Sequence, residues 1–186
     1  MSKIVFISGP CGCGKSTFSD ALARHLAYCD NKTVYIIHGD DFHAGFIEPP
    51  QERGDFFVNG EASDTVLWED ILKFNWGCIL DTADRALSRG MDVIIDYIIE
   101  KELSRIIELA KKHNAEFFYI VLTASAEILE SRIRSRGDID MINRSLFLKK
   151  ELEAMPENQG HIYDNTGKSI KEMVNDIIIQ DYKFNL

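Results

Sequence analysis

The sequence predicts an α/β fold, a three-layer sandwich in which a parallel sheet of about five strands carries helices on both faces. Short apolar segments alternate along the chain with segments whose apolar residues recur at helical spacing. The apolar segments lack polar alternation, which is typical of parallel strands buried on both faces. The length of 186 residues suits one domain with a full-sized core, and no linker or internal repeat is visible.

Five apolar segments are expected to form the strands. KIVFIS, KTVYIIHG, DVIID and EFFYIVLT are rich in β-branched and aromatic residues, and GHIYDNT holds a shorter fifth strand. In chain order they cover residues 3–8, 32–39, 92–96, 116–123 and 160–166. Sheets of this kind bind ligands beyond the carboxyl ends of their strands, so residues that follow a strand are the candidate site residues.

Segments with apolar residues three and four apart are expected to form helices. They cover residues 18–26, 66–74, 79–87, 101–113, 126–136, 143–154 and 169–179. Gly90 is predicted to end the helix that precedes the third strand, because glycine favours helix C-caps. The polar stretch 41–64 contains EPPQERGD and is predicted to be a turn-rich loop.

A glycine-rich loop joins the first strand to the first helix. Gly9, Gly14, Lys15 and Ser16 give the spacing G-x-x-x-x-G-K-[ST] of the phosphate-binding loop of P-loop NTPases. Backbone N–H groups of such a loop converge on phosphates, the lysine bridges the β- and γ-phosphates, and the serine hydroxyl holds Mg²⁺. The expected nucleotide-binding residues are Gly9, Cys11, Gly12, Cys13, Gly14, Lys15, Ser16 and Thr17.

Two carboxylates follow the second strand. Asp40 and Asp41 should lie on the same rim as the phosphate loop. A kinase needs a carboxylate to orient and deprotonate its acceptor hydroxyl. Asp40 could instead cap a short helix, since aspartate is a favoured cap. His43 is a candidate substrate contact, and a solvated or capping histidine is the alternative.

These segments resemble the small P-loop kinases of metabolites and nucleosides. GPCGCGKST, HGDDFH, DVIID and RIRSRGD stand in the order and spacing of that group, which includes uridine, nicotinamide riboside and gluconate kinases and chloramphenicol phosphotransferase. The resemblance implies that Asp40 is the base for the acceptor hydroxyl, with Asp41 as the alternative. It also implies that Asp96 holds Mg²⁺ through water, whereas a strand-end cap is the other interpretation of this residue.

An arginine cluster resembles the lid of such kinases. Arg132 and Arg136 are four residues apart on one helix face, Arg134 points away, and Arg144 follows. Arginines that close over phosphates balance the charge that develops during phosphoryl transfer. A lid is therefore predicted over residues 132–148. The alternative is a solvated helix whose arginines pair with neighbouring glutamates.

The loop DNTGKSIKEM follows the last predicted strand. It contacts the adenine ring in similar kinases, so Thr166 and Lys168 are candidate nucleotide contacts. Ser169 and Glu172 have the spacing of a capping box, which would make the segment an ordinary helix start. The two interpretations carry equal weight.

Charge and composition exclude several classes of partner. The net charge of −9 argues against broad contact with nucleic acid or an anionic membrane. No window approaches the roughly 18 uninterrupted apolar residues of a membrane span, and no signal peptide is visible. We therefore expect a cytoplasmic protein, a monomer or homodimer, with reduced thiols at its four cysteines.

The expected function is ATP- and Mg²⁺-dependent transfer of the γ-phosphoryl group to a hydroxyl of a small molecule, such as a nucleoside, a sugar or an antibiotic-like acceptor. The alternatives are an ATPase or nucleotide-binding regulatory protein, and a toxin-like kinase of a nucleotide sugar or nucleic-acid end. A GTPase is disfavoured, because D-x-x-G does not follow the third strand and N/T-K-x-D is absent.

Overall fold

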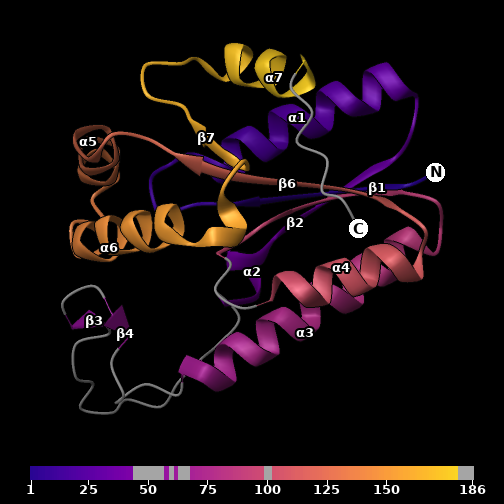
Figure 1. The fold of residues 1–186 in the computed structure, drawn as a ribbon, viewed down its shortest axis with the longest axis horizontal. Helices are drawn as coiled ribbons and strands as arrows, with labels where there is room; N and C mark the ends of the chain where they lie inside the picture. Colours follow the sequence, from indigo (N-terminus) through magenta and orange to yellow (C-terminus); the bar gives the residue numbers. More distant parts are fainter. Residues whose placement is uncertain (44–56, 59–60, 63–67, 99–101, 180–186) are drawn as a thin grey trace.

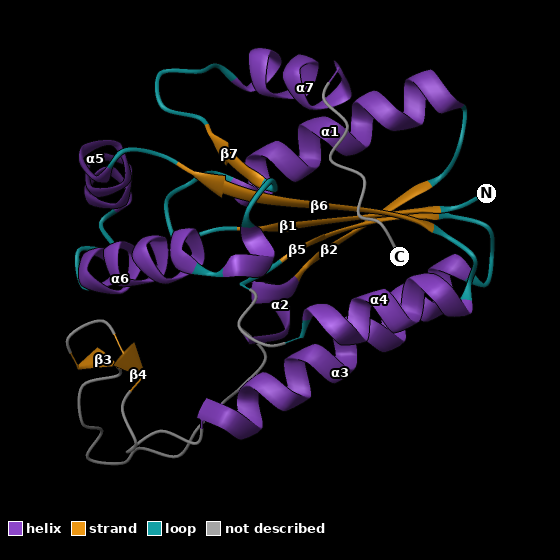
Figure 2. Ribbon diagram, in the orientation of Figure 1, coloured by secondary structure: helices purple, strands orange, loops and turns teal. Residues whose placement is uncertain are grey.

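The computed structural model describes residues 1–43, 57–58, 61–62, 68–98 and 102–179. Five parallel strands form one sheet in the order β2-β5-β1-β6-β7, which confirms the predicted α/β fold (Figure 2). The strands are β1 (Lys3–Ser8), β2 (Val34–His38), β5 (Asp92–Asp96), β6 (Glu116–Thr123) and β7 (Ile162–Asp164).

Helices cover both faces of the sheet (Figure 1). One face carries α1 (Lys15–Asp30) and α7 (Ile170–Ile179), and the other carries α3 (Trp68–Leu87) and α4 (Leu103–Lys112). At the carboxyl ends of the strands lie α2 (Gly39–His43), α5 (Ala126–Arg136) and α6 (Met141–Ala154), and η1 (Pro156–Asn158) follows α6. A search of the described residues finds no helix that is both long enough and apolar enough for a membrane span.

Two predicted elements differ from the structure. The helix α3 runs without a break through Gly77, whereas the spacing predicted separate segments at 66–74 and 79–87. Its neighbours Trp76 and Ile79 are fully buried, so packing outweighs the low helix propensity of this glycine. Within the predicted loop 41–64, residues 41–43 belong to α2, and four further described residues form an antiparallel pair, β3 (Phe57–Val58) and β4 (Glu61–Ala62).

Alternate side chains of β1 enter two separate cores. Phe6 packs towards α3, with its ring centroid 5.8 Å from that of Trp76. Ile7 points to the other face and packs with Phe18 of α1. Because successive strand residues face opposite sides of a sheet, a strand covered on both faces needs the unbroken apolar run that the sequence shows.

The parallel register aligns the carboxyl ends of the central strands. Ile7 of β1 and His38 of β2 both pair with Asp96 of β5. On the other side of β1, Ser8 pairs with Val121 of β6. The loops that follow these strands therefore leave the sheet along one rim.

Gly39 starts α2 where β2 ends, and its lack of a side chain leaves room for a fixed aromatic ring. A Cβ at this position would lie 2.3 Å from Cδ2 of Tyr97. The ring of Tyr97 lies edge-on to Trp76 with centroids 5.5 Å apart, and Nδ2 of Asn75 donates to its hydroxyl at 3.0 Å. Because these contacts hold the ring, it cannot move away from an added methyl group without loss.

We expect Gly39→Ala to lower the free energy of unfolding by about 1–3 kcal/mol, the usual cost of overpacking a core. Urea unfolding followed by circular dichroism measures it. The matched control is Gly77→Ala, because a Cβ at that helical position meets nothing within 4 Å. The control should raise stability by roughly 0.5–1 kcal/mol. Equal unfolding midpoints for Gly39→Ala and the wild type would contradict the steric account.

Candidate functional site

The phosphate loop, residues 9–14, has a backbone that requires its glycines. The φ angles of Gly9, Gly12 and Gly14 are 145°, 77° and 93°, values that residues with side chains rarely adopt. A Cβ on Gly9 would lie 2.3 Å from the carbonyl oxygen of Leu122, and one on Gly12 would lie 2.9 Å from Cγ1 of Ile133. The loop is therefore packed closely against β6 and α5.

The first turn of α1 continues this loop. It begins at Lys15 with Gly14 as the N-cap, followed by the exposed residues Ser16 and Thr17. Glycine has no side-chain oxygen with which to accept from the N–H groups of the turn. Those groups and the positive end of the helix remain for an anion, which is the arrangement that binds phosphate.

Lys15 lies folded over its own loop. Its Nζ donates to the carbonyl oxygens of Gly9 at 2.9 Å and Pro10 at 3.3 Å. Burial alone would lower the pKa of Lys15, but the loop cysteines together with Asp40 and Asp96 outweigh it and raise that pKa above its ordinary value. Lys15 is therefore a cation at neutral pH, as a partner of phosphate must be.

Ser16 and Asp96, the two residues predicted to hold Mg²⁺, lie side by side. Ser16 Oγ donates to Asp96 Oδ1 at 3.1 Å, and Asp96 is buried at the end of β5. A hydroxyl and a carboxylate next to a phosphate loop suit Mg²⁺, which prefers oxygen ligands and keeps several waters. The second carboxylate oxygen of Asp96 contacts His38 Nδ1 at 2.6 Å. His38 was not predicted as a site residue.

Asp40 and Asp41 occupy the first turn of α2, and both are exposed. Acidic side chains stabilise this end of a helix, so a helix-terminal role and a catalytic role are compatible. The negative charge of Asp40 contributes to the raised pKa of Lys15, which places this carboxylate within electrostatic reach of the phosphate loop. His43 ends α2, and its side chain falls outside the described part of the chain.

Arg132, one of the predicted lid residues, contacts the phosphate loop, and its role in a lid stays a prediction. Its Nη1 donates to the carbonyl oxygens of Gly12 and Cys13, each at 3.4 Å, and to Oδ1 of Asn165 at 3.1 Å. Asn165 is fully buried, and its Nδ2 donates to the Cys13 carbonyl oxygen at 2.7 Å. The helix α5 and the segment after β7 therefore hold the loop together. Asn165 was not predicted, although it directly follows a strand end.

Arg132 and Arg136 were predicted to lie on one helix face. The structure does not bring both side chains to the phosphate loop. Arg136 is exposed, with its Nε 3.4 Å from Oδ2 of Asp138. Arg134 lies 2.6 Å from Glu130, which is the solvated ion pair that the alternative interpretation expected. In this structure the end of α5 therefore presents one arginine to the phosphate loop.

The helix α6 also contacts the loop, through Ser145. Its Oγ donates to the carbonyl oxygen of Cys11 at 2.7 Å. The neighbouring Arg144 is buried, with its guanidinium carbon 5.7 Å from the ring centroid of Phe147. Cys11 and Cys13 have free thiols, and burial raises the pKa of Cys13. The cysteines thus take part in these contacts through their carbonyl groups.

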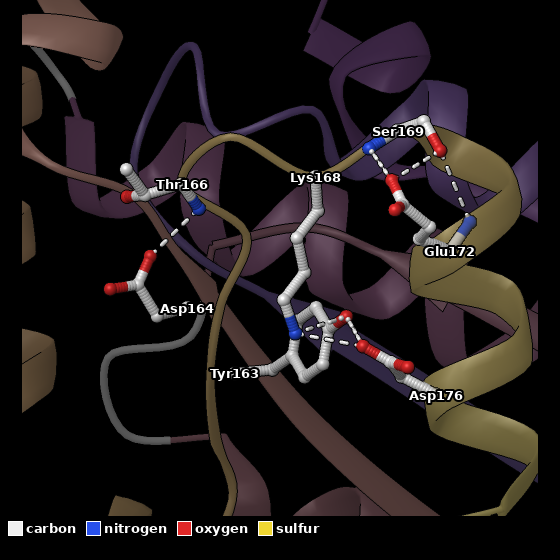
Figure 3. Close-up of polar contacts among 7 residues, drawn as sticks. All are labelled: Tyr163, Asp164, Thr166, Lys168, Ser169, Glu172 and Asp176. Carbon is white, nitrogen blue, oxygen red and sulfur yellow. Dashed lines mark hydrogen bonds and ion pairs between the residues drawn. The ribbon is translucent and has the colours of Figure 1, made fainter.

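Thr166, the predicted adenine contact, lies on an exposed turn after β7 (Figure 3). Its Oγ1 accepts from the backbone N–H of Ser125 at 2.7 Å, and its own N–H donates to Oδ1 of Asp164 at 2.8 Å. The turn is therefore tied to the start of α5. The adenine contact stays a prediction.

Lys168, the second candidate in this loop, is held by side chains of β7 and α7 (Figure 3). Its Nζ donates to Oδ2 of Asp176 at 2.7 Å and to the hydroxyl of Tyr163 at 3.1 Å, and it lies 4.4 Å from the centre of the Tyr163 ring. The hydrogen bond with Asp176 raises the pKa of Lys168 and lowers the pKa of Asp176. These contacts fasten α7 to the sheet.

The capping-box interpretation of Ser169 and Glu172 is confirmed (Figure 3). The Ser169 N–H donates to Glu172 Oε2 at 2.8 Å, and the Glu172 N–H donates to Ser169 Oγ at 3.3 Å. The Ser169 hydroxyl also donates to Glu172 Oε2 at 2.6 Å. These hydrogen bonds to the Glu172 carboxylate lower its pKa.

We expect Ser169→Ala to lower the free energy of unfolding by about 1 kcal/mol near neutral pH, as loss of a helix cap does. The folded-state pKa of Glu172 is depressed, so its contribution is present above its ordinary pKa of about 4.3 and is lost as the pH falls through the folded value. The cost should therefore shrink in urea unfolding at about pH 3. Ser88→Ala, which removes an exposed hydroxyl elsewhere, should change stability by less than about 0.5 kcal/mol. A cost for Ser169→Ala that does not depend on pH would exclude the carboxylate contribution.

Known proteins match this chain in sequence and in fold. It is 30% identical over 141 residues to the guanylate kinase of Carboxydothermus hydrogenoformans, a match over 72% of this chain and 65%, just under two thirds, of that enzyme. The APS kinase of Mycobacterium tuberculosis, solved with AMPPNP and APS, superposes with a TM-score of 0.62 at 17% identity, covering 96% of both chains.

A gluconokinase from Sinorhizobium meliloti shares the fold with a TM-score of 0.53 at 20% identity, over 94% of this chain and 88% of its own. At such identities the solved structures establish a P-loop kinase-like fold, in agreement with the resemblance noted in the sequence. The family model for an AAA domain matches residues 4–159, a range that contains the phosphate loop, Asp40, Asp96 and Arg132. This chain therefore belongs to the AAA domain family of P-loop proteins.

Proposed function

We propose that this protein is a kinase that transfers the γ-phosphoryl group of ATP to a hydroxyl of a small molecule. The observation that carries the proposal is the 3.1 Å contact between Ser16 and Asp96, beside the phosphate loop and Lys15. P-loop enzymes hold the Mg²⁺ of a nucleoside triphosphate with such a serine and such a carboxylate. The kinase-like fold and the AAA domain family support the same conclusion.

The phosphate loop and its neighbours would bind the triphosphate. Lys15 would exchange the carbonyl oxygens of its own loop for the β- and γ-phosphates, and the N–H groups of the first turn of α1 would bind phosphate oxygens. Mg²⁺ bound through Ser16 and Asp96 would neutralise part of the phosphate charge. Arg132 would supply a further positive charge, because it lies at the loop already.

The acceptor would approach from the side of α2. We propose Asp40 as the base, because its charge already acts on Lys15, with Asp41 and His43 as further substrate contacts. The hydroxyl oxygen forms a bond to the γ-phosphorus as the bond from that phosphorus to the β–γ bridging oxygen breaks. The hydroxyl proton passes to Asp40. The products are a phosphate ester and ADP.

We also propose a domain organisation, an oligomeric state and a cellular location for the protein. The chain would form a single P-loop kinase domain, with an acceptor-side loop over 41–64 and a lid over 132–148 that carries Arg136 and Arg144. Thr166 would lie beside the adenine ring. We propose a monomer or homodimer in the cytoplasm, where thiols such as Cys11, Cys13, Cys29 and Cys78, all free in the structure, stay reduced.

A nucleotide acceptor is a second candidate, and a specific observation favours it. The guanylate kinase match is a sequence match at 30% identity, higher than the 17% of the APS kinase. An enzyme of that kind transfers the phosphoryl group to a phosphate oxygen of a nucleotide, so it needs cationic groups at the acceptor more than a base. Asp40 and Asp41 in the first turn of α2 favour the hydroxyl acceptor instead.

We expect one compound class to stimulate ADP release from Mg-ATP by the purified protein. The panel contains nucleosides, ribosides, sugars, sugar acids, aminoglycoside- and chloramphenicol-like antibiotics, and nucleoside monophosphates including GMP. Mass spectrometry identifies the phosphorylated product. A phosphorylated hydroxyl compound supports the proposal, whereas phosphorylation of GMP supports the second candidate. Steady hydrolysis that no compound stimulates would contradict both and indicate an ATPase.

We expect Asp40→Asn to lower kcat for the identified acceptor by about 10²- to 10⁴-fold, the usual contribution of general base catalysis. The dissociation constant for Mg-ATP should change little, because the phosphate loop is intact. Asp41→Asn is the matched comparison, since it makes the same change in the same helical turn. Near-normal turnover of Asp40→Asn with loss in Asp41→Asn would move the base to Asp41.

A further inference from the structure

Four side chains form a series of contacts at the predicted Mg²⁺ site. Ser16 of α1 contacts Asp96 of β5, with 3.1 Å between Oγ and Oδ1. Asp96 Oδ2 lies 2.6 Å from Nδ1 of His38, and Nε2 of His38 lies 3.8 Å from Oδ1 of Asp20. Ser16 and Asp20 are four residues apart on one face of α1. The series thus begins and ends on α1 and passes through the ends of β5 and β2.

The chemistry of the groups fixes the direction of the central hydrogen bond. A carboxylate only accepts hydrogen bonds, so Nδ1 of His38 carries the hydrogen and donates it to Asp96. The distance of 2.6 Å is short, as expected where an ionised group takes part. The Asp96 side chain is 2% exposed, that of His38 27% and that of Asp20 51%. His38 therefore lies between the buried carboxylate and a carboxylate at the surface.

We propose that His38 is a positioning residue for the metal-binding carboxylate. Its N–H holds Oδ2 of Asp96 and so keeps Oδ1 turned towards Ser16 and the Mg²⁺ site. The terminal torsion of an aspartate is broad, so without this donor the carboxylate can rotate away. Second partners of this kind orient the ligands of metal sites. The inference rests on the proposed function, because it takes Asp96 to hold the Mg²⁺ of the nucleotide.

The imidazole is not needed to hold the two strands together. The backbone ladder pairs β2 with β5 over their whole lengths, from Val34 opposite Asp92 to His38 opposite Asp96. A single cross-strand side-chain pair contributes only a small part of the stability of such a sheet. Removal of the imidazole should therefore act on the carboxylate and leave the sheet intact.

The test is the Mg²⁺ dependence of nucleotide binding, measured with a fluorescent ribose-labelled ATP analogue. His38→Ala removes the donor, whereas His38→Asn places an amide N–H near the former Nδ1 position. In EDTA all variants should bind the analogue with equal affinity. We expect His38→Ala to raise the Mg²⁺ concentration at half-maximal effect by about 10- to 100-fold, the usual range for loss of such a partner. His38→Asn should stay close to the wild type.

The chain offers a matched control in a second histidine–aspartate pair. His113 Nε2 lies 2.6 Å from Oδ1 of Asp84, between the end of α4 and the helix α3. His113→Ala removes a contact of the same length and chemistry away from the phosphate loop. It should leave the Mg²⁺ dependence unchanged. Thermal melting of each variant separates a loss of folded protein from a change at the site.

Three results would overturn the inference. His38→Ala with the wild-type Mg²⁺ dependence would show that Asp96 needs no donor at Oδ2. His38→Asn as impaired as His38→Ala would show that the hydrogen bond at Nδ1 is not what matters. A wild type that binds the analogue without Mg²⁺ dependence, or not at all, would overturn the proposed function together with the inference. The first two results leave the proposed function standing.

Discussion

The register of β5 against its two neighbours decides where the polar groups of the site lie. This strand carries one buried carboxylate at each end. Asp92 Oδ1 accepts from the Lys3 N–H at 2.8 Å and lies 3.6 Å from Nζ of Lys32, while Asp96 contacts Ser16 and His38. A slip by one residue would turn both carboxylates to the opposite face and leave them buried without these partners. The contacts around the proposed Mg²⁺ site therefore also oppose alternative registers.

The sequence was sufficient to predict the fold and the phosphate loop, because both depend on local patterns. The metal-binding role of Asp96 was implied only by the resemblance to small P-loop kinases, because no pattern in the sequence gives its distance from Ser16. Apolar runs identify the strands, the glycine spacing identifies the loop, and a parallel sheet brings strand ends to one rim. His38 ends a strand too, but its partner depends on β2 lying next to β5. That neighbour relation is a property of strand order, which a pattern within one segment does not contain.

Asn165 and Ser145 were also not predicted, because no sequence pattern identifies their partners. Asn165 and Ser145 donate to backbone carbonyl groups, and every residue type supplies a carbonyl. Arg132 and Arg136 share a helical repeat, yet a helix at the edge of the loop can direct one side chain inward while the next turn lies in solvent. Helical spacing predicts which residues share a face, and packing decides which of them contacts the phosphate loop.

The hydrogen bonds around the phosphate loop suggest how a chain of net charge −9 can attract a polyanion. The carbonyl oxygens of residues 9–13 all accept from side chains: Lys15 binds the first two, Ser145 the third, Arg132 the fourth, and Arg132 with Asn165 the fifth. A carbonyl oxygen turned towards a phosphate would repel it. When Lys15 turns to the phosphates, Ser145, Arg132 and Asn165 still hold the oxygens of residues 11–13, so the N–H groups of the loop would be available to the anion. The proposed attraction would thus be local, and it would persist at ionic strengths that screen the overall negative charge.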